Sequence, residues 1–221
     1  CFKTNTSDTY VTLSEYVSNM KKNQKSIYYL TGSKIIELKN SPLLEVCNKK
    51  GLQVLLMDHE IDEMTFGSVQ KYKEYDFKSI NHANALEEIQ ADEEQKDQKI
   101  DIDPFIKKVK KVLGDKVKDV VASKRLSDSP SCVVADSNDP TAQMQELFKQ
   151  MGQAGMPASK PIFEINPKHK IIKKLSKMNK NKQFDDSVML LFDQALLVSN
   201  IKIDNPGEFI SRINRVLEKS L

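Results

Sequence analysis

The sequence predicts a small α/β unit followed by an α+β domain that ends in helices. In the first hundred residues, segments with helical periodicity alternate with short apolar runs, which predicts a three-layer unit with a short parallel sheet. The second half places its strand candidates before a final series of helices. Between the halves, residues 86–103 are polar and acidic and have too few apolar side chains for a core. We therefore expect two domains, residues 1–100 with the acidic linker and residues 101–221.

Capping residues and apolar runs mark the elements of the first half. Thr12 and Glu15 form a capping box, which predicts a helix that begins there. Residues 52–57 are almost continuously apolar, a pattern favoured where both faces of a sheet are covered. Gly51 ends the helix before them. The expected strands are residues 26–30 and 52–57, and the expected helices follow Thr12 and span residues 33–39 and 42–51.

The second half opens with a helix whose two ends are clearly signalled. Asp103 can cap it, Pro104 takes the first position and Gly114 stops it. A turn at residues 127–130 separates two strand candidates. The expected strands are residues 117–122, 132–135 and 162–165, and the later helices are residues 140–151, 168–178, 183–199 and 206–219.

Composition limits the classes of function. The 221 residues include 34 basic and 31 acidic side chains, and a net charge of +3 does not require an anionic partner. Cys1, Cys47 and Cys132 are scattered and lack CxxC spacing, so we expect reduced thiols rather than disulfides or a zinc site. No apolar run is long enough for a signal peptide or a membrane span. Because the chain begins at Cys1 in a polar stretch, we expect a piece of a longer soluble protein.

Motifs of common active sites are missing. The sequence has no GxxxxGKS/T, GxGxxG or GxSxG pattern, so it predicts neither a phosphate-binding loop nor a nucleophile elbow. His59, His82 and His169 are far apart and form no metal-ligand pair, which favours surface or capping roles. We therefore predict no catalytic residue, metal or cofactor site within this chain.

An acidic cluster follows the apolar run at residues 52–57. Asp58, Glu60, Asp62 and Glu63 lie where a buried strand ends, and α/β folds often place sites there. They could bind a cation and serve a metal-dependent enzyme. Because no partnering catalytic residue is identifiable, a solvated helix N-terminus stabilised by the helix dipole is the better interpretation.

Lysines recur between residues 168 and 182, around His169. They form a basic face that could meet RNA, DNA or an acidic protein. No Phe, Tyr or Trp lies among them, which favours a solvated face. A nucleic-acid-binding protein that uses Lys168–Lys182 is the alternative function. The lysines are Lys168, Lys170, Lys173, Lys174, Lys177, Lys180 and Lys182.

The helix expected at residues 140–151 carries one apolar stripe at i, i+3, i+4 and i+7 spacing. Apolar stripes on helices are usually core. Thioethers adapt to varied partners, however, and the polar loops on both sides would let this helix project from the rest of its domain. Core packing and partner binding therefore both remain open for Met144, Leu147, Phe148 and Met151.

The last two expected helices carry more apolar surface than one small domain should cover. The helix at residues 183–199 is apolar on nearly every side, so it must be covered on nearly every side. A two-fold pairing of both helices would form an intermolecular four-helix bundle, and a monomeric core is the alternative. The predicted dimer-interface residues are Val188, Leu190, Leu191, Ala195, Leu196, Val198, Ile210, Ile213 and Leu217.

Several segments, in order, resemble the heat-shock protein 90 family of chaperones. Gln24-Lys-Ser-Ile-Tyr-Tyr29 and Ile61-Asp-Glu63 look like the end of that family's middle domain. Phe163-Glu-Ile-Asn-Pro-Lys-His169 and Leu190-Leu-Phe-Asp-Gln-Ala-Leu-Leu197 resemble its C-terminal domain. The resemblance covers nearly the whole chain.

This resemblance implies an ATP-driven homodimeric chaperone that assists protein folding. Its ATP and Mg²⁺ would bind in an N-terminal domain outside this chain, so the full-length protein would be an ATPase while this fragment would not be an enzyme. The last two helices would form the dimer, and the stripe that includes Met144 would bind client proteins. The implied partners are a second copy, non-native or late-folding clients and, as a further candidate, co-chaperones, with no nucleic acid and no membrane.

Two departures from the family pattern bear on its type and on one contact. The chain stops at Glu218-Lys-Ser-Leu221 without an acidic tail, which fits a bacterial, cytoplasmic type or, alternatively, one of an organellar matrix. Met64 stands where the bacterial pattern has an aromatic residue, and the segment to Tyr75 is longer. The roles of Glu63 and Met64 therefore stay unassigned.

Overall fold

The chain divides into two compact units. The computed structural model describes residues 1–59, 61–90, 101–152 and 159–219. Unit 1 comprises Cys1–Asp97 and Ala135–Ser159, and unit 2 comprises Gln98–Val134 and Lys160–Leu221. No helix of the described part of the chain is long and apolar enough to cross a membrane.

The segment Ala135–Ser159 groups with unit 1, whereas the sequence predicted one boundary near residue 100. Backbone hydrogen bonds hold its beginning: the Ala135 N–H donates to the Asn81 carbonyl at 2.8 Å, and the Ala83 N–H donates to the Ala135 carbonyl at 2.9 Å. The His82 ring nitrogen Nε2 lies 3.2 Å from the Asp139 carbonyl oxygen. The chain therefore leaves unit 1, returns to it, and leaves it again.

The sheet of unit 1 has the strand order β1-β3-β2-β5-β4. Its centre is parallel, because β2 pairs in parallel with both β3 and β5, while β1 and β4 are antiparallel edge strands. The sequence predicted the two central strands and missed the short or polar ones around them. The strands are β1 (Lys3–Thr4), β2 (Ser26–Thr31), β3 (Leu55–Met57), β4 (Lys71–Tyr72) and β5 (Tyr75–Ser79).

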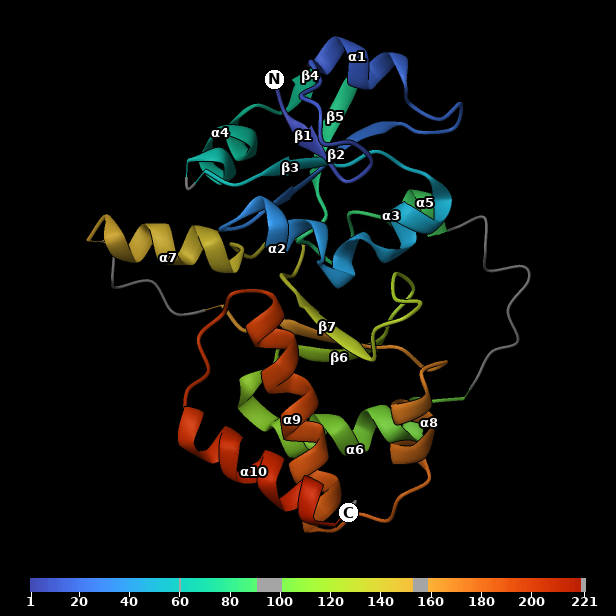
Figure 1. Cartoon of the computed structure of the whole chain (residues 1–221), viewed down its shortest axis with the longest axis vertical. Coiled ribbons are helices and arrows are strands. Elements are labelled where there is room, and N and C mark those ends of the chain that lie inside the picture. The colour runs from blue at the N-terminus through green and yellow to red at the C-terminus, as the bar shows by residue number, and fades with distance from the viewer. Residues whose placement is uncertain (60, 91–100, 153–158, 220–221) are drawn as a thin grey trace. The chain divides into compact units, whose positions relative to one another are not determined.

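Helices cover both faces of this sheet. Figure 1 shows α1 and α4 on one side and α2 and α3 on the other. Every residue of β2 is buried, which is the expected result for a central strand between two layers of helices. The helices of unit 1 are α1 (Leu13–Ser18), α2 (Ile35–Lys39), α3 (Glu45–Lys50), α4 (Asp62–Ser68), α5 (Glu87–Gln90) and α7 (Ala142–Gln150).

A buried tyrosine joins α1 to the sheet. The capping box predicted at Thr12 and Glu15 is present, and it starts the helix that carries Tyr16. The Tyr16 hydroxyl donates to the Gln53 carbonyl at 2.7 Å and accepts from the Tyr28 N–H at 3.0 Å. Burial raises the pKa of this hydroxyl far above its ordinary value, so it stays a neutral donor. One polar atom thus satisfies backbone groups of two neighbouring segments.

We expect Tyr16→Phe to lower the free energy of unfolding of the chain by about 1–3 kcal/mol, because it leaves a partly buried carbonyl and a buried N–H without this partner. The midpoint of urea unfolding measures the effect. Tyr10→Phe is the matched control, since the Tyr10 side chain is 65% exposed. Equal midpoints for the two variants would contradict the role given to the Tyr16 hydroxyl.

Unit 2 has a three-stranded sheet with the order β6-β8-β7. The central strand β8 is parallel to β6 and antiparallel to β7. The helix predicted from Asp103 to Gly114 is present, but Ile102 occupies the cap position and Asp103 makes no side-chain cap bond. The elements are α6 (Asp103–Leu113), β6 (Asp119–Ala122), β7 (Ser131–Val134), β8 (Ile162–Ile165), α8 (Lys170–Ser176), α9 (Lys182–Val198) and α10 (Pro206–Glu218).

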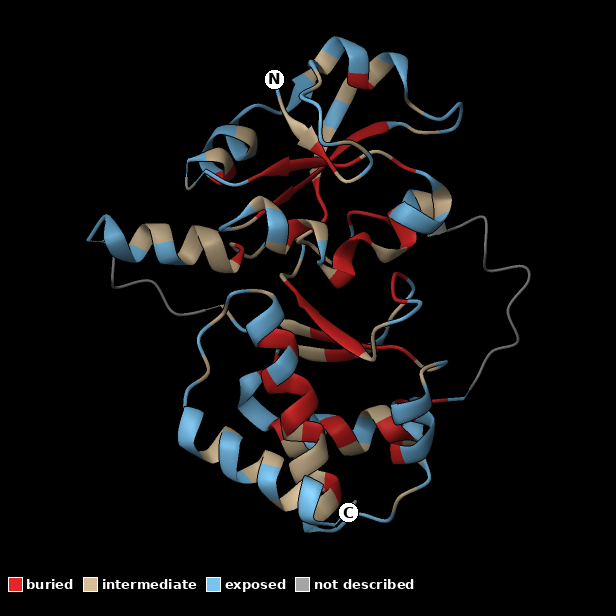
Figure 2. Cartoon of the chain, viewed as in Figure 1, coloured by how far each residue is buried: buried red, intermediate tan, exposed pale blue. Residues whose placement is uncertain are grey.

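One apolar core is shared by the sheet of unit 2 and by α6, α8 and α9. Edge-to-face ring pairs connect its layers, with centroids 6.1 Å apart for Phe105 and Phe184 and 5.5 Å apart for Phe163 and Phe192. Figure 2 shows the buried residues gathered on β7, α6 and α9. The helix α10 contributes no buried residue to this core.

A buried ion pair lies beside this core. The Arg125 side chain is 1% exposed, and its Nε lies 3.2 Å from the Glu164 carboxylate. The Ser123 hydroxyl donates to the same carboxylate at 2.6 Å. The buried Glu164 carboxylate is thus both paired with a guanidinium and hydrogen-bonded by a hydroxyl, and the ion pair connects the loop after β6 to β8.

Candidate functional site

The helix α9 packs one of its faces into the core of unit 2. Of the residues that the sequence assigned to a dimer interface, four lie in this core and one more is buried. A helix that is apolar on nearly every side gives no sequence signal for which side faces the core of its own chain. The four core residues are Val188, Leu191, Ala195 and Leu196, and the other buried one is Leu190.

The helix α10 is attached to α9 by ion pairs. The Arg215 guanidinium donates to both oxygens of the Asp186 carboxylate at 2.9 Å and to the Glu208 carboxylate at 2.9 Å. One turn away, Arg212 donates to Asp193 at 2.9 Å. Two-pronged contacts of this kind fix geometry as well as supply energy. They hold α10 against α9 although no residue of α10 is buried.

The carboxylates in this network differ in pKa. Hydrogen bonds from Arg215 hold the pKa values of Asp186 and Glu208 below their ordinary values of 3.8 and 4.5. Burial raises the pKa of Asp193, and the nearby Arg212 guanidinium only partly offsets this effect. We therefore assign the favourable electrostatic contribution to the Arg215 contacts, while the buried Asp193 carboxylate carries a desolvation cost.

An apolar surface remains exposed on both helices. The exposed fractions are 47% for Leu197, 51% for Val198, 53% for Ile210 and 51% for Leu217. On α10, Ile210, Ile213 and Leu217 fall at i, i+3 and i+7, so they form one stripe, in which Ile213 is half-buried. Figure 2 shows α10 without any buried residue. The sequence prediction included Val198, Ile210, Ile213 and Leu217 in this surface and missed Leu197, which neighbours Val198.

We expect Arg215→Gln to lower the melting temperature at pH 7, and the difference from the unchanged chain to shrink on acidification. The folded-state pKa values of Asp186 and Glu208 are lowered, so the stabilisation of the fold by these carboxylates is complete above pH 4.5. It is lost as the pH falls through the two folded-state pKa values. Thermal melts between pH 7 and about pH 3.5 measure this. Lys34→Gln, which removes one exposed ion pair with Glu37, is the control. A difference that does not depend on pH would refute the assignment.

A second candidate surface lies on α7, in unit 1. The Thr141 hydroxyl caps this helix by accepting from the Met144 N–H at 3.2 Å. No residue of α7 is buried, although the helix carries the predicted apolar stripe. Met144, Leu147 and Phe148 are half-buried, and Met151 is 55% exposed. The stripe is therefore neither fully buried in unit 1 nor fully exposed to solvent.

The partner of α7 inside unit 1 is α4. A Cβ atom at Gly67 of α4 would lie 3.9 Å from the Met144 methyl carbon, so this methionine is directed toward α4. Ile61, Met64 and Gly67 are spaced three residues apart, which places them on neighbouring positions of one helix face. Ile61 is 66% and Met64 is 36% exposed. This contact brings the α7 stripe against α4, which the sequence assigned to no surface. We refer to the stripe together with Ile61 and Met64 as the surface formed by α4 and α7.

Contacts with the sheet of unit 1 hold α4 in place. The Thr31 hydroxyl donates to the buried Glu63 carboxylate, and the Phe66 ring contacts the rings of Tyr29 and Phe77 at centroid distances of 5.6 and 5.0 Å. Glu63 therefore serves as a structural anchor in this fold. A surface built on an anchored helix is presented in a defined geometry.

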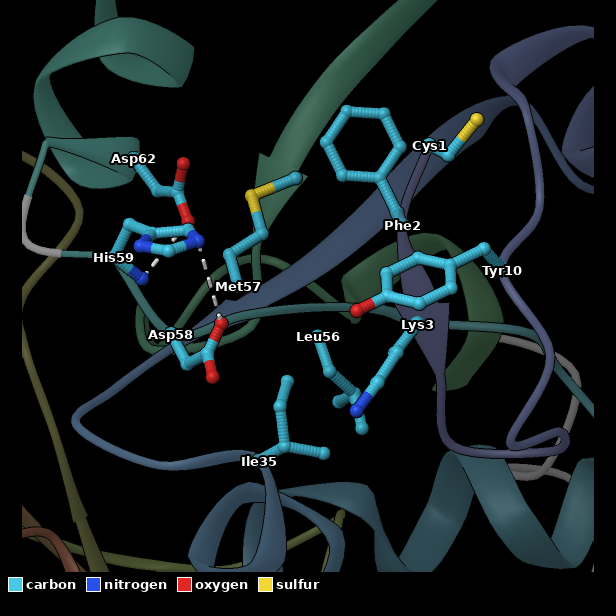
Figure 3. A pocket seen from close by; sticks show the side chains of 10 residues that line it. All are labelled: Cys1, Phe2, Lys3, Tyr10, Ile35, Leu56, Met57, Asp58, His59 and Asp62. Carbon is cyan, nitrogen blue, oxygen red and sulfur yellow. Dashed lines mark hydrogen bonds and ion pairs between the residues drawn. The ribbon is translucent and has the colours of Figure 1, made fainter.

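The acidic cluster does not form a metal site within the described residues, which contain no group of three or more potential ligands. Glu63 points into the sheet, and Glu60 lies outside the described residues. Asp62 accepts from the His59 backbone N–H at 3.1 Å, in the first turn of α4, as expected for a helix N-terminus. Figure 3 shows Asp58, His59 and Asp62 at the wall of a pocket of about 230 Å³.

The other two histidines have capping and loop roles. His169 precedes α8, and its Nδ1 accepts from the Ile171 N–H at 3.2 Å. His82 contacts the Asp139 carbonyl through Nε2. The cysteines are free thiols, with Cys1 exposed and Cys47 and Cys132 buried.

Known proteins match this chain along its whole length. A profile of the family described as Hsp90 protein matches residues 1–221. The chain is 44% identical to the chaperone protein HtpG of Treponema denticola, 44% identical to that of Legionella pneumophila strain Paris and 41% identical to that of Buchnera aphidicola subsp. Schizaphis graminum. These alignments cover 95%, 95% and 96% of this chain but 33%, 34% and 34% of the relatives, so the chain spans about a third of their length.

Proposed function

The chain belongs to the Hsp90 family, and from this premise we propose that it is the dimerisation and client-binding part of an ATP-dependent molecular chaperone. ATP and Mg²⁺ would bind outside these 221 residues, so the chain alone would hydrolyse no ATP. The relatives are bacterial, which supports a place in the bacterial cytoplasm. The observation that carries the proposal is α10, an amphipathic helix with an exposed apolar stripe and no buried residue.

The unburied stripe of α10 supports dimerisation. A two-fold pairing lets α9 and α10 of each copy cover the same helices of the other, which makes an intermolecular four-helix bundle. Burying the exposed half of a Leu or Ile side chain contributes about 1 kcal/mol, and two-fold symmetry counts each side chain twice. The ion pairs of Arg212 and Arg215 would hold α10 in place before the copies meet, so little ordering cost remains for association.

We expect Ile210→Ser combined with Leu217→Ser to weaken dimerisation on the order of a thousandfold, because four half-exposed apolar side chains are lost per dimer. Light scattering of the 221-residue chain at tens of micromolar measures the mass. Ile36→Ser in unit 1 is the matched control, since Ile36 is 67% exposed and lies on α2. A monomeric unchanged chain at this concentration would reject the proposal.

The surface formed by α4 and α7 supports client binding. Non-native proteins expose apolar side chains of varied shape, and a flexible thioether surface adapts to them. Met64, Met144 and Met151 all lie on this surface, and each is at least partly exposed. The stripe on α7 is incompletely buried in unit 1, which leaves apolar area for a partner.

We expect Met144→Ser, Leu147→Ser and Phe148→Ser together to raise the concentration of full-length protein that half-suppresses client aggregation by about tenfold, because three partly exposed apolar contacts are removed. Turbidity of a heat-denatured client measures this. Met151→Ser should give a smaller effect in the same direction. Tyr10→Ser is the control, and unchanged melting curves verify folding. Suppression equal to that of the control would reject the assignment.

A further inference from the structure

A lysine face lies on unit 2, on and after α8, and neither proposed surface uses it. Residues 168–182 contain seven lysines and no acidic residue, and all seven lysines are exposed. The chain has 34 basic and 31 acidic side chains, so the rest of it holds 27 basic residues against 31 acidic ones, a net charge of −4. The seven lysines of this segment therefore carry more positive charge than the whole chain has as net charge, which is +3.

Several basic residues elsewhere in the chain are paired with carboxylates. Lys39, Lys78, Lys110 and Lys116 each form an ion pair with a carboxylate, and so do the arginines of α10. Within the described residues, no ion pair is formed by Lys170, Lys173, Lys174, Lys177, Lys180 or Lys182. A solvated surface usually intersperses both signs of charge. This segment does not.

The fold fixes the direction of the lysine face. Ile172 and Leu175 anchor α8 in the core of unit 2, and His169 caps its start. Lys170, Lys173, Lys174 and Lys177 then lie at spacings of three and four residues on the outer side, where like charges repel one another. Carboxylates from a partner would relieve this repulsion.

An exposed isoleucine lies among the lysines. Ile171 is 46% exposed, and it neighbours Lys170 in sequence and Lys174 one helical turn on. This combination fits a partner segment in which carboxylates flank an apolar side chain. The face offers no aromatic ring on which a nucleic-acid base could stack, because residues 168–182 contain no Phe, Tyr or Trp.

We propose that the Lys168–Lys182 face docks an acidic protein segment that carries an apolar residue between its carboxylates, with Ile171 as the apolar contact. This is an interaction surface in addition to the dimer and client surfaces, and it does not depend on them. Attraction at exposed charges acts within about 10 Å at ordinary salt, so binding should weaken as salt is added.

Fluorescence anisotropy with a labelled synthetic peptide tests the proposal on the 221-residue chain. The probe has about twelve residues in which glutamates flank single leucines, and the comparison probes carry glutamine for glutamate or are short DNA duplexes. Neutralising Lys173, Lys174 and Lys177 to Gln should weaken peptide binding by about tenfold, the factor expected for three exposed ion pairs. The matched control is K21Q, K22Q and K25Q, which neutralises three exposed lysines of unit 1.

The outcomes separate the proposal from its alternatives. Support requires salt-sensitive binding of the acidic peptide, loss in the α8 variant, no loss in the control, and about threefold weaker binding after Ile171→Ser. Far-ultraviolet circular dichroism verifies that each variant is folded. Equal binding of the glutamine peptide, tighter binding of the DNA duplex through the same lysines, or no binding of the acidic peptide would each overturn it.

Discussion

Unit 2 depends on one constraint, which is that the apolar side chains around α9 must be kept from water. A helix with apolar residues around most of its circumference loses stability wherever those residues stay in water, and the core of unit 2 covers only one side of α9. The helix α10 lies against α9 through ion pairs and adds its own apolar stripe to the exposed surface. Folding of one copy therefore ends with apolar area still exposed, and a second copy is the partner that we propose for it.

Electrostatics and burial have separate tasks in this arrangement. Arg215 bridges Asp186 and Glu208 and so sets the position of α10, while the side chains of Ile210 and Leu217 stay about half exposed. Had apolar burial within the chain fixed α10, the same side chains could not also serve an interface. Paired charges supply orientation without consuming apolar area, which is why they suit a helix that has a second surface to cover.

In unit 1, contacts with the sheet fix one side of α4 and leave its other side exposed. Glu63 is bound by Thr31, and Phe66 enters an aromatic cluster, so the outer face of α4 stays exposed together with α7. Both units thus combine a polar anchor with an exposed apolar face. On α8 the roles are reversed. The apolar residues Ile172 and Leu175 anchor the helix in the core, and its exposed side carries the lysines.

Local signals in the sequence determined where many elements begin and end. The capping box at Thr12 and the left-handed Gly51 after α3 depend only on neighbouring residues, and both are present. The tertiary structure alone decided which side of α9 is buried, that Glu63 is an anchor and that Ala135–Ser159 returns to unit 1. These features depend on contacts between residues far apart in sequence, and local pattern carries no record of such contacts.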